Sequence, residues 1–292
     1  MLKNRLIPCL LLRNGLIVQS KQFKRWQVLG NPTTAVRRLS VWASDELIYL
    51  DISPNPVYDL KRDDLNHPNR GSLTEIIRDV AKYCFMPLTF GGGVRTLEDI
   101  RVRLGAGADK VSLNTQAVLT PTLVTEAAET FGSQCVVLSI DAAINAKGRH
   151  EVKIQRGKEW TGLAPVEWAV EVEKRGAGEI LLNSIDRDGA MKGFDIDLIR
   201  GVVEAVSIPV IAIGGAGKWE DLGAALSEGC ASAVSAANIF HYTEQSVLNA
   251  KKYLFSKGFN VRDPKLLEDK FRDKSSVHDP TLAWMDKRKS LG

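Results

Sequence analysis

Short apolar runs alternate with amphipathic stretches along most of the chain. Each apolar run is rich in Val, Ile and Leu, and the stretch that follows has the spacing of a helix of about a dozen residues. Strands that alternate with helices in this way predict a closed (βα)8 TIM barrel. The predicted strands are Leu6–Leu12, Leu47–Ile52, Leu88–Phe90, Lys110–Leu113, Val136–Ile140, Glu179–Ser184, Val210–Ile213 and Ala233–Ala236.

The two halves of the chain repeat one another. MPLTFGGGVRTLED (Met86–Asp99) matches IPVIAIGGAGKWED (Ile208–Asp221), and DELIYLD matches GEILLNS with Glu46 opposite Glu179. The repeat predicts two half-barrels. The sequence separation between matching stretches is 11 residues shorter for the first pair, around the third and seventh strands, than for the second pair, around the second and sixth strands. The first half therefore holds extra residues, in a long loop after the second strand, Ser53–Ser72.

Residues 1–262 are predicted to form the barrel domain and residues 263–292 a C-terminal tail. The tail carries seven basic and six acidic residues, with Leu282 and Trp284 as its main apolar side chains. We expect it either to dock through Trp284 or to be partly disordered.

Composition and charge are those of an ordinary soluble protein. Of the 292 residues 44% are hydrophobic and 25% charged, and basic residues are interleaved with acids at a net charge of +4, so nucleic-acid binding is not expected. The sequence has no apolar run near the roughly 20 residues of a membrane span and no secretory signal, which predicts a cytoplasmic protein without a membrane partner. The cysteines occur singly, so we expect buried free thiols, no metal site and no cofactor. They are Cys9, Cys84, Cys135 and Cys230.

Glycine-rich stretches follow the third and seventh predicted strands, at the barrel end where chemistry is usually located. They are FGGG (Phe90–Gly93) and GGAG (Gly214–Gly217), and each has a polar companion after the next strand, LNT (Leu113–Thr115) or SAAN (Ser235–Asn238). Backbone amides at such loops can bind phosphate. A single glycine run is more often a simple turn, but the symmetric pair favours two anion sites.

Two carboxylates lie at the same predicted end. Asp141 ends the fifth strand and Asp188 follows the sixth, where a carboxylate can act as a general acid or base. A helix cap or a salt-bridged loop residue is the alternative interpretation. The histidines have no partners at metal-ligand spacing and are expected to be structural or solvated. They are His67, His150, His241 and His278.

Charged residues of alternating sign begin four strands at the opposite end of the barrel. Arg5, Glu46, Lys110 and Glu179 start the first, second, fourth and sixth strands. They are either solvated rim charges or a group that pairs across the barrel axis, because buried charges persist only when they are paired.

Several stretches together resemble HisF, the cyclase subunit of imidazole glycerol phosphate synthase. They are FGGGVRTLED, GADKVSLNT, FGSQ, EVEKRGAGEILLNSIDRDG and GGAGK, and the likeness runs from Met1 to about Arg262. The resemblance implies a (βα)8 barrel that takes ammonia from a partner glutaminase of the HisH type. It also implies that ammonia passes along the barrel interior to a phosphorylated acceptor at the barrel mouth.

Roles carry over from the resemblance position by position. The four charged residues at the strand starts match the family's ammonia gate, and Asp141 matches its catalytic Asp on the fifth strand; we add Asp188 as a second catalytic candidate. Asp109 and Gln134 match residues at the glutaminase-facing end and in the barrel interior, which predicts coupling to the partner. The predicted phosphate- and substrate-binding residues are Gly92, Gly93, Asn114, Thr115, Asn183, Gly189, Gly214, Gly215, Ala237 and Asn238.

Five positions depart from the family pattern. Leu11 stands where the family has its other catalytic Asp, and Gln19 where a flexible loop offers a phosphate-contacting Lys. Asn183 replaces a Thr, Asn238 a Ser, and Ile213 a small polar residue. Leucine cannot transfer a proton, so the two-carboxylate cyclisation loses one partner.

The departures make the chain similar to divergent second-copy HisF proteins of surface-polysaccharide gene clusters. The leading hypothesis is therefore a synthase subunit of a glutamine amidotransferase in lipopolysaccharide biosynthesis, which passes ammonia to a nucleotide-activated sugar together with a third, ATP-using transferase. One alternative is an authentic cyclase of histidine biosynthesis, a lyase that tolerates Leu11. A second alternative is a non-catalytic scaffold that activates the glutaminase and docks a transferase through Ser53–Ser72 or the tail at Trp284.

Overall fold

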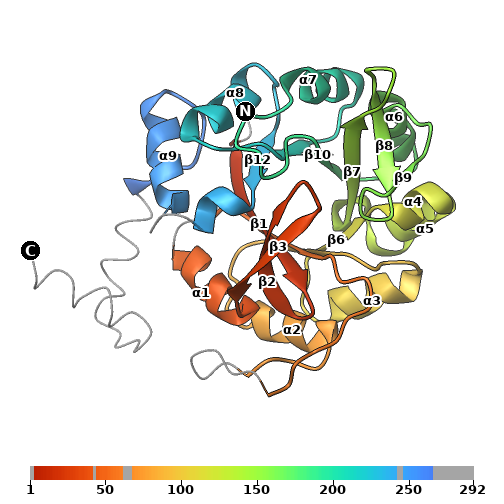
Figure 1. The fold of residues 1–292 in the computed structure, drawn as a ribbon, viewed down its shortest axis with the longest axis vertical. Coiled ribbons are helices and arrows are strands. Elements are labelled where there is room, and N and C mark those ends of the chain that lie inside the picture. The colour runs from red at the N-terminus through yellow and green to blue at the C-terminus, as the bar shows by residue number, and fades with distance from the viewer. Residues whose placement is uncertain (1–2, 42–43, 62–67, 242–245, 266–292) are drawn as a thin grey trace, which may run out of the picture.

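The fold is a closed barrel of eight parallel strands with helices between them (Figure 1). The structure, a computed structural model, describes residues 3–41, 44–61, 68–241 and 246–265. The strand order is β10-β11-β12-β1-β4-β5-β6-β7, and pairing of β7 with β10 closes the ring. The predicted (βα)8 fold and each predicted strand are thus confirmed. The strands are β1 (Arg5–Arg13), β4 (Leu47–Asp51), β5 (Leu88–Gly91), β6 (Lys110–Leu113), β7 (Val136–Ile144), β10 (Glu179–Ser184), β11 (Val210–Ile213) and β12 (Ala233–Ala236).

The helices form a layer around the strands. Side-chain caps fix where two of them begin: the Ser72 oxygen accepts from the backbone N–H of Glu75, and Thr96 forms a capping box with Asp99. Within the described residues, no helix is long and apolar enough to cross a membrane. The helices are α1 (Pro32–Val41), α2 (Leu73–Ala81), α3 (Leu97–Gly105), α4 (Thr115–Leu119), α5 (Thr122–Phe131), α6 (Pro165–Lys174), α7 (Ile196–Ala205), α8 (Trp219–Ser227) and α9 (Ser246–Ser256).

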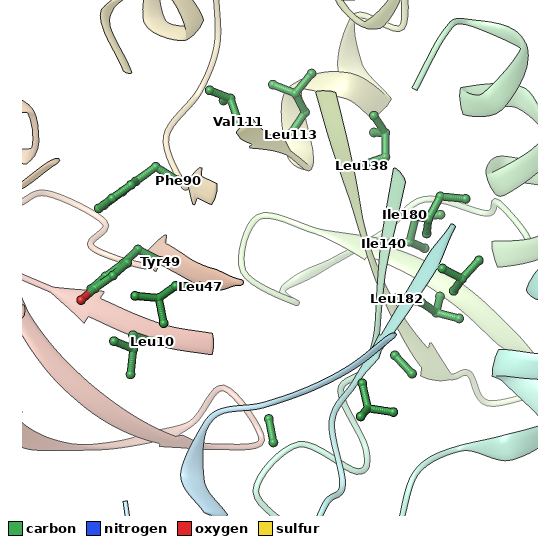
Figure 2. Close-up of a cluster of buried hydrophobic side chains, with 14 of the residues drawn as sticks. Leu10, Leu47, Tyr49, Phe90, Val111, Leu113, Leu138, Ile140, Ile180 and Leu182 are labelled. Atoms are coloured by element: carbon green, nitrogen blue, oxygen red, sulfur yellow. The ribbon is translucent and has the colours of Figure 1, made fainter. Parts of the chain in front are cut away.

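Side chains of each barrel strand alternate between the helix layer and the barrel interior, as the period of two requires. Leu6, Leu10 and Leu12 of β1 point outward to the helices, into a core where the rings of Tyr49 and Phe90 stack with centroids 4.9 Å apart (Figure 2). The inward-facing residues form a separate inner apolar cluster. Its members are Ile7, Cys9, Leu11, Val18, Ile48, Val137, Leu181, Ile211, Ile213 and Ala233.

Two antiparallel hairpins that the sequence did not predict extend the sheet at the mouth. The first consists of β2 (Leu16–Lys21) and β3 (Arg25–Gly30) and pairs with β1; the second consists of β8 (His150–Ile154) and β9 (Glu159–Trp160) and pairs with β7. The turn of the first hairpin has positive φ at both Gln22 and Phe23, 49° and 58°. Such turns usually contain Asn or Gly, so this one lacks the usual hairpin signal.

The prediction of buried thiols is wrong in part. Cys9 is buried, Cys84 and Cys135 are half-buried, and Cys230 is exposed. Cys230 is exposed because it lies in the turn before β12, where its backbone has a φ of 55°. Its thiol donates to the Ser227 carbonyl there.

Several predictions fall on residues outside the described part of the chain. These are docking of the tail through Leu282 and Trp284 and the roles of His67 and His278. Of the predicted loop, residues 53–61 and 68–72 are described and contain no helix. The Tyr58 ring of this loop packs against Gly15, where an added Cβ would lie 2.8 Å from it.

Candidate functional site

Asp141 is held at the mouth by two amide side chains. β7 pairs with β10 so that Asp141 lies beside Asn183, and Asn114 follows the neighbouring strand β6. The Nδ2 groups of Asn183 and Asn114 each donate to one Asp141 carboxylate oxygen at 2.9 Å. Burial raises the pKa of Asp141 to about 6, although both amides lower it. A carboxyl group with this pKa can accept and release a proton near neutral pH.

Asp188 lies close to Asp141 and to the tip of the β2–β3 hairpin. Burial and, to a smaller extent, the negative charge of Asp141 together raise the pKa of Asp188 to about 6. The Ser20 hydroxyl donates to the Asp188 carboxylate at 3.4 Å, and the Gln22 N–H donates to the Asp188 carbonyl at 3.1 Å. Asp188 therefore both neighbours the candidate catalytic carboxylate and anchors the hairpin over the mouth.

The wall across the mouth from Asp141 is apolar. β1 is four strands from β7 in the ring, so Leu11 lies on the far side of the barrel. Leu11 pairs with Val18 of β2 and packs in the inner apolar cluster with Ile213. Leu11 and Ile213 are each 9% exposed, which is consistent with packing, and neither side chain can donate or accept a proton.

The first glycine loop has the backbone conformation that a phosphate site needs. Gly92 and Gly93 have φ values of 94° and 64°, and a Cβ at Gly92 would lie 2.0 Å from the Asp51 carbonyl oxygen, so a side chain there is excluded. Thr115 begins α4 beside this loop's predicted companion Asn114. Its hydroxyl accepts from the Gln155 N–H of the second hairpin at 3.0 Å.

The second glycine loop lines a cavity of about 20 Å³ together with Asp188 and Gly189. Gly214 and Gly215 have φ values of 95° and 116°, and Ala237 and Asn238 from the end of β12 complete the lining. The structure thus brings the residues of the second predicted half-site together around one cavity, with the hairpin lying over it.

Four charged residues close the opposite end of the barrel as a charged ring. Arg5 contacts Glu46 at 2.6 Å and Glu179 at 2.5 Å, and Lys110 contacts each of the same two carboxylates at 2.9 Å. Burial lowers the pKa of Lys110, but the charges of Glu179 and Glu46 outweigh it and raise that pKa. The pairing across the axis that the sequence allowed is therefore present.

Hydroxyl side chains line the interior between the charged ring and the mouth. Lys110 and Ser112 of β6, and Asn114 just after it, lie two residues apart and face inward, because Val111 and Leu113 pack in the outer core. Thr89 of β5, which pairs with Lys110, and Ser139 of β7 also face inward, and Ser235 lies in β12. The Ser235 hydroxyl is buried and has no hydrogen-bond partner.

The residues predicted to couple to a partner lie at the charged-ring end. Asp109 and Gln134 are both exposed there, so Gln134 lies on the rim rather than in the barrel interior that its family match predicted. Asp109 has a local structural contact, since its carboxylate accepts from the Leu88 N–H at 2.8 Å. Neither described histidine enters the mouth site: His150 contacts Asp195 at 2.9 Å, and His241 lies beside Arg38.

Sequence reasoning missed two residues that shape this site. Ser20 contacts Asp188 and, through its carbonyl oxygen, Asn238. Arg103 lies buried under the first glycine loop, where its Nη2 donates to the Gly92 carbonyl at 2.8 Å. Its spacing of three from the buried Ile100 was the one available signal that this Arg faces inward.

The chain matches a known protein family over most of its length. The model of a family described as "Histidine biosynthesis protein" matches residues 5–246, a range that contains every barrel strand and every residue of the mouth and charged-ring sites above.

Proposed function

We propose a function from the premise that the chain belongs to the histidine biosynthesis protein family. The chain is the synthase subunit of a glutamine amidotransferase. It receives ammonia from a glutaminase of the HisH type at the charged ring and passes it through the barrel. The ammonia is added at the mouth to a phosphate-bearing acceptor, a nucleotide-activated sugar used in surface-polysaccharide synthesis.

The charged ring, which closes the barrel end opposite the mouth, is the observation that carries this proposal. Four ion pairs hold Arg5, Glu46, Lys110 and Glu179 across the axis with both carboxylates less than 9% exposed. Such a group is costly to bury, and well-packed apolar residues would close a barrel end equally well. A functional reason for keeping it is that one flexible Lys side chain can move aside and admit a small neutral molecule.

The inner wall of β6 offers a route from the ring to the carboxylates. Ammonia that passes Lys110 meets the hydroxyl of Ser112 and then the amide of Asn114, which also holds Asp141. The third, ATP-using enzyme would first phosphorylate an oxygen on the acceptor carbon. Ammonia attacks that carbon, the new C–N bond forms, the C–O bond to the phosphate breaks, and phosphate leaves with the bonding electron pair while the nitrogen becomes cationic. Ionised Asp141 then removes one N–H proton, which leaves a neutral amine on the acceptor.

The apolar wall around Leu11 supports an acceptor other than the histidine-pathway substrate. Imidazole ring closure in the resembling family needs a second carboxylate at this position, and Leu11 packs with Val18 and Ile213 instead. The third, ATP-using enzyme would activate the acceptor, because the described residues at the mouth offer proton transfer but no group that activates a carbon for substitution.

The test is to express the chain with its HisH-type glutaminase and ask for two results. The complex should hydrolyse glutamine faster than the glutaminase alone, and it should fail to rescue a histidine auxotroph that lacks the cyclase subunit. Robust rescue by the natural sequence would overturn the assignment to another acceptor, and absence of any complex would overturn the amidotransferase.

A second candidate function is the cyclase of histidine biosynthesis, which the family match itself favours. In that case Asp188, which lies near Asp141 and has a pKa of about 6, supplies the second carboxylate that Leu11 cannot. Cyclising activity that is lost in Asp141→Asn and in Asp188→Asn would establish this alternative.

A further inference from the structure

The two half-barrels repeat each other in sequence, but their glycine loops differ in charge. Arg103 lies in α3 under the first loop, and the position that matches it in the repeat is Ala225 in α8. Arg103 is 8% exposed, and Ala225 is fully buried. An arginine charge thus accompanies the first loop and is absent from the matching position of the second.

Arg103 is placed to act on an anion at the first loop. Its Nη2 donates to the Gly92 carbonyl at 2.8 Å and its Nη1 to the Asp99 carbonyl at 2.9 Å. A Cβ at the exposed Gly93 would lie 3.9 Å from Nη2, so the guanidinium lies directly beneath that surface. Its Nε is buried and has no hydrogen-bond partner.

Nearby carboxylates offset this charge only in part. The closest Asp99 oxygen is 3.8 Å from Arg103, and the Asp99 carboxylate also accepts from the N–H groups of Arg95 and Thr96. Burial raises the pKa of Asp51, the other acid near the guanidinium. Arginine keeps its proton in proteins, so the first loop retains a positive centre beneath it.

The second loop is partly filled by the chain itself. Asn238 Nδ2, the predicted donor to a phosphate, donates instead to the Ser20 carbonyl of the hairpin at 2.7 Å. A Cβ at Gly189 would lie 2.7 Å from the same oxygen. The hairpin thus occupies part of the space beside the second loop, where a cavity of about 20 Å³ remains.

The groups around the second loop are also poorly suited to an anion. Asp188 lines the cavity, and Asn238 Oδ1, which can only accept hydrogen bonds, is buried there without a partner. The Arg187 side chain lies beside Gly215, but its guanidinium donates to the Lys192 carbonyl at 3.1 Å. Side chains at this loop therefore offer phosphate oxygens fewer donors than Arg103 does at the first loop, and only backbone amides remain as a shared feature of the two loops.

We infer that the acceptor has a single anionic centre: its phosphate binds at Gly92–Gly93 above Arg103, and an uncharged part extends towards Leu11 and the second half-barrel. This inference rests on the proposed function and narrows its substrate class. A nucleotide-linked sugar fits, because its diphosphate is one anionic centre between uncharged rings. A molecule with a phosphate at each end does not fit.

Calorimetric titration of the complex of the full chain with its glutaminase tests this inference without any mutation. Inorganic phosphate should bind with one equivalent per barrel, and a sugar bisphosphate should bind within about threefold of the matching sugar monophosphate. Two equivalents of phosphate, or a bisphosphate bound about 100-fold more tightly, would overturn the inference and leave the proposed amidotransferase standing. If no phosphate compound binds, the phosphate-bearing acceptor of the proposed function falls as well, whereas stimulation of the glutaminase tests the ammonia path separately.

Matched variants then locate the phosphate. Arg103→Met should weaken phosphate binding about tenfold, the usual loss when one charge-assisted contact is removed, and Arg103→Lys should retain affinity within about threefold. Equal loss in both variants would mean that Arg103 only supports the loop.

Asn238→Asp, which adds a charge at the second loop, should change phosphate affinity less than threefold. A large loss in Asn238→Asp with none in Arg103→Met would place the phosphate at the second half-barrel and contradict the inference.

Discussion

Asp141→Asn should stabilise the protein at neutral pH while it abolishes function. Burial is the main cause that raises the pKa of Asp141 from 3.8 to about 6. A carboxyl group whose pKa is higher in the folded than in the unfolded state costs stability when it ionises. The cost is absent below the unfolded pKa, grows as the pH rises between the two pKa values, and is complete above the folded pKa.

The pKa difference sets the size of this effect. It corresponds to about 3 kcal/mol at pH 8 and to less than about 1 kcal/mol at pH 4. Asn at position 141 keeps the shape but turns one acceptor into an NH2 group. The Asn183 amide can rotate to meet it, because its Oδ1 is buried and has no partner at present. Loss of the Asp141 charge also removes one of the causes that raise the pKa of Asp188, and this adds to the gain in the free energy of unfolding.

Urea unfolding of the variant and the natural chain at pH 4 and pH 8 measures the effect. We expect Asp141→Asn to gain about 2 to 3 kcal/mol at pH 8 and little at pH 4. Glu129→Gln, on the exposed face of α5, is the control and should change neither value. A variant that is no more stable than the natural chain at pH 8 would refute the burial of an ionisable Asp141.

Two further substitutions test the mouth. Leu11→Asp places a carboxylate in the inner apolar cluster and should cost about 3 kcal/mol at pH 8 and less at pH 4 in the same unfolding assay. It should not rescue a histidine auxotroph, because the other departures from the cyclase pattern remain, and strong rescue would show an otherwise intact cyclase site. Gly92→Ala should cost at least about 2 kcal/mol and abolish phosphate binding, since its Cβ would lie 2.0 Å from the Asp51 carbonyl. Gly148→Ala, at a similar positive φ but in open space, should cost about 1 kcal/mol in thermal unfolding and leave binding intact.

The barrel could be predicted from the sequence because its signals are local and repeated. Each strand is a short apolar run that ends at a turn residue, and the repeat around Glu46 and Glu179 fixed the register of the two halves. The charged ring followed from four ionisable residues at equivalent strand starts. All strands of a parallel barrel start at the same end, so the order of strands along the sequence was enough to place these four residues together.

What could not be predicted depends on contacts between distant segments. The β2–β3 hairpin turns at Gln22–Phe23, where residues other than glycine adopt positive φ, and it is anchored by Asp188 from far along the chain. Arg103 looks like one more charged residue of a polar helix until the fold places it beneath Gly93. Cys230 lies in the turn before β12, and the exposure of its side chain depends on the conformation of that turn.

The central claim is that ammonia passes through the barrel from the charged ring to the mouth. The most direct test supplies amide-15N glutamine and excess unlabelled ammonium to the complex with its glutaminase, its transferase and an extract of nucleotide-linked sugars, and reads the label by mass spectrometry. We expect 15N in a nucleotide-linked sugar at a share above that of the bulk ammonia, and a fall to the bulk share in Lys110→Met. A product from the unaltered complex that carries only the bulk share of 15N would contradict passage through the barrel.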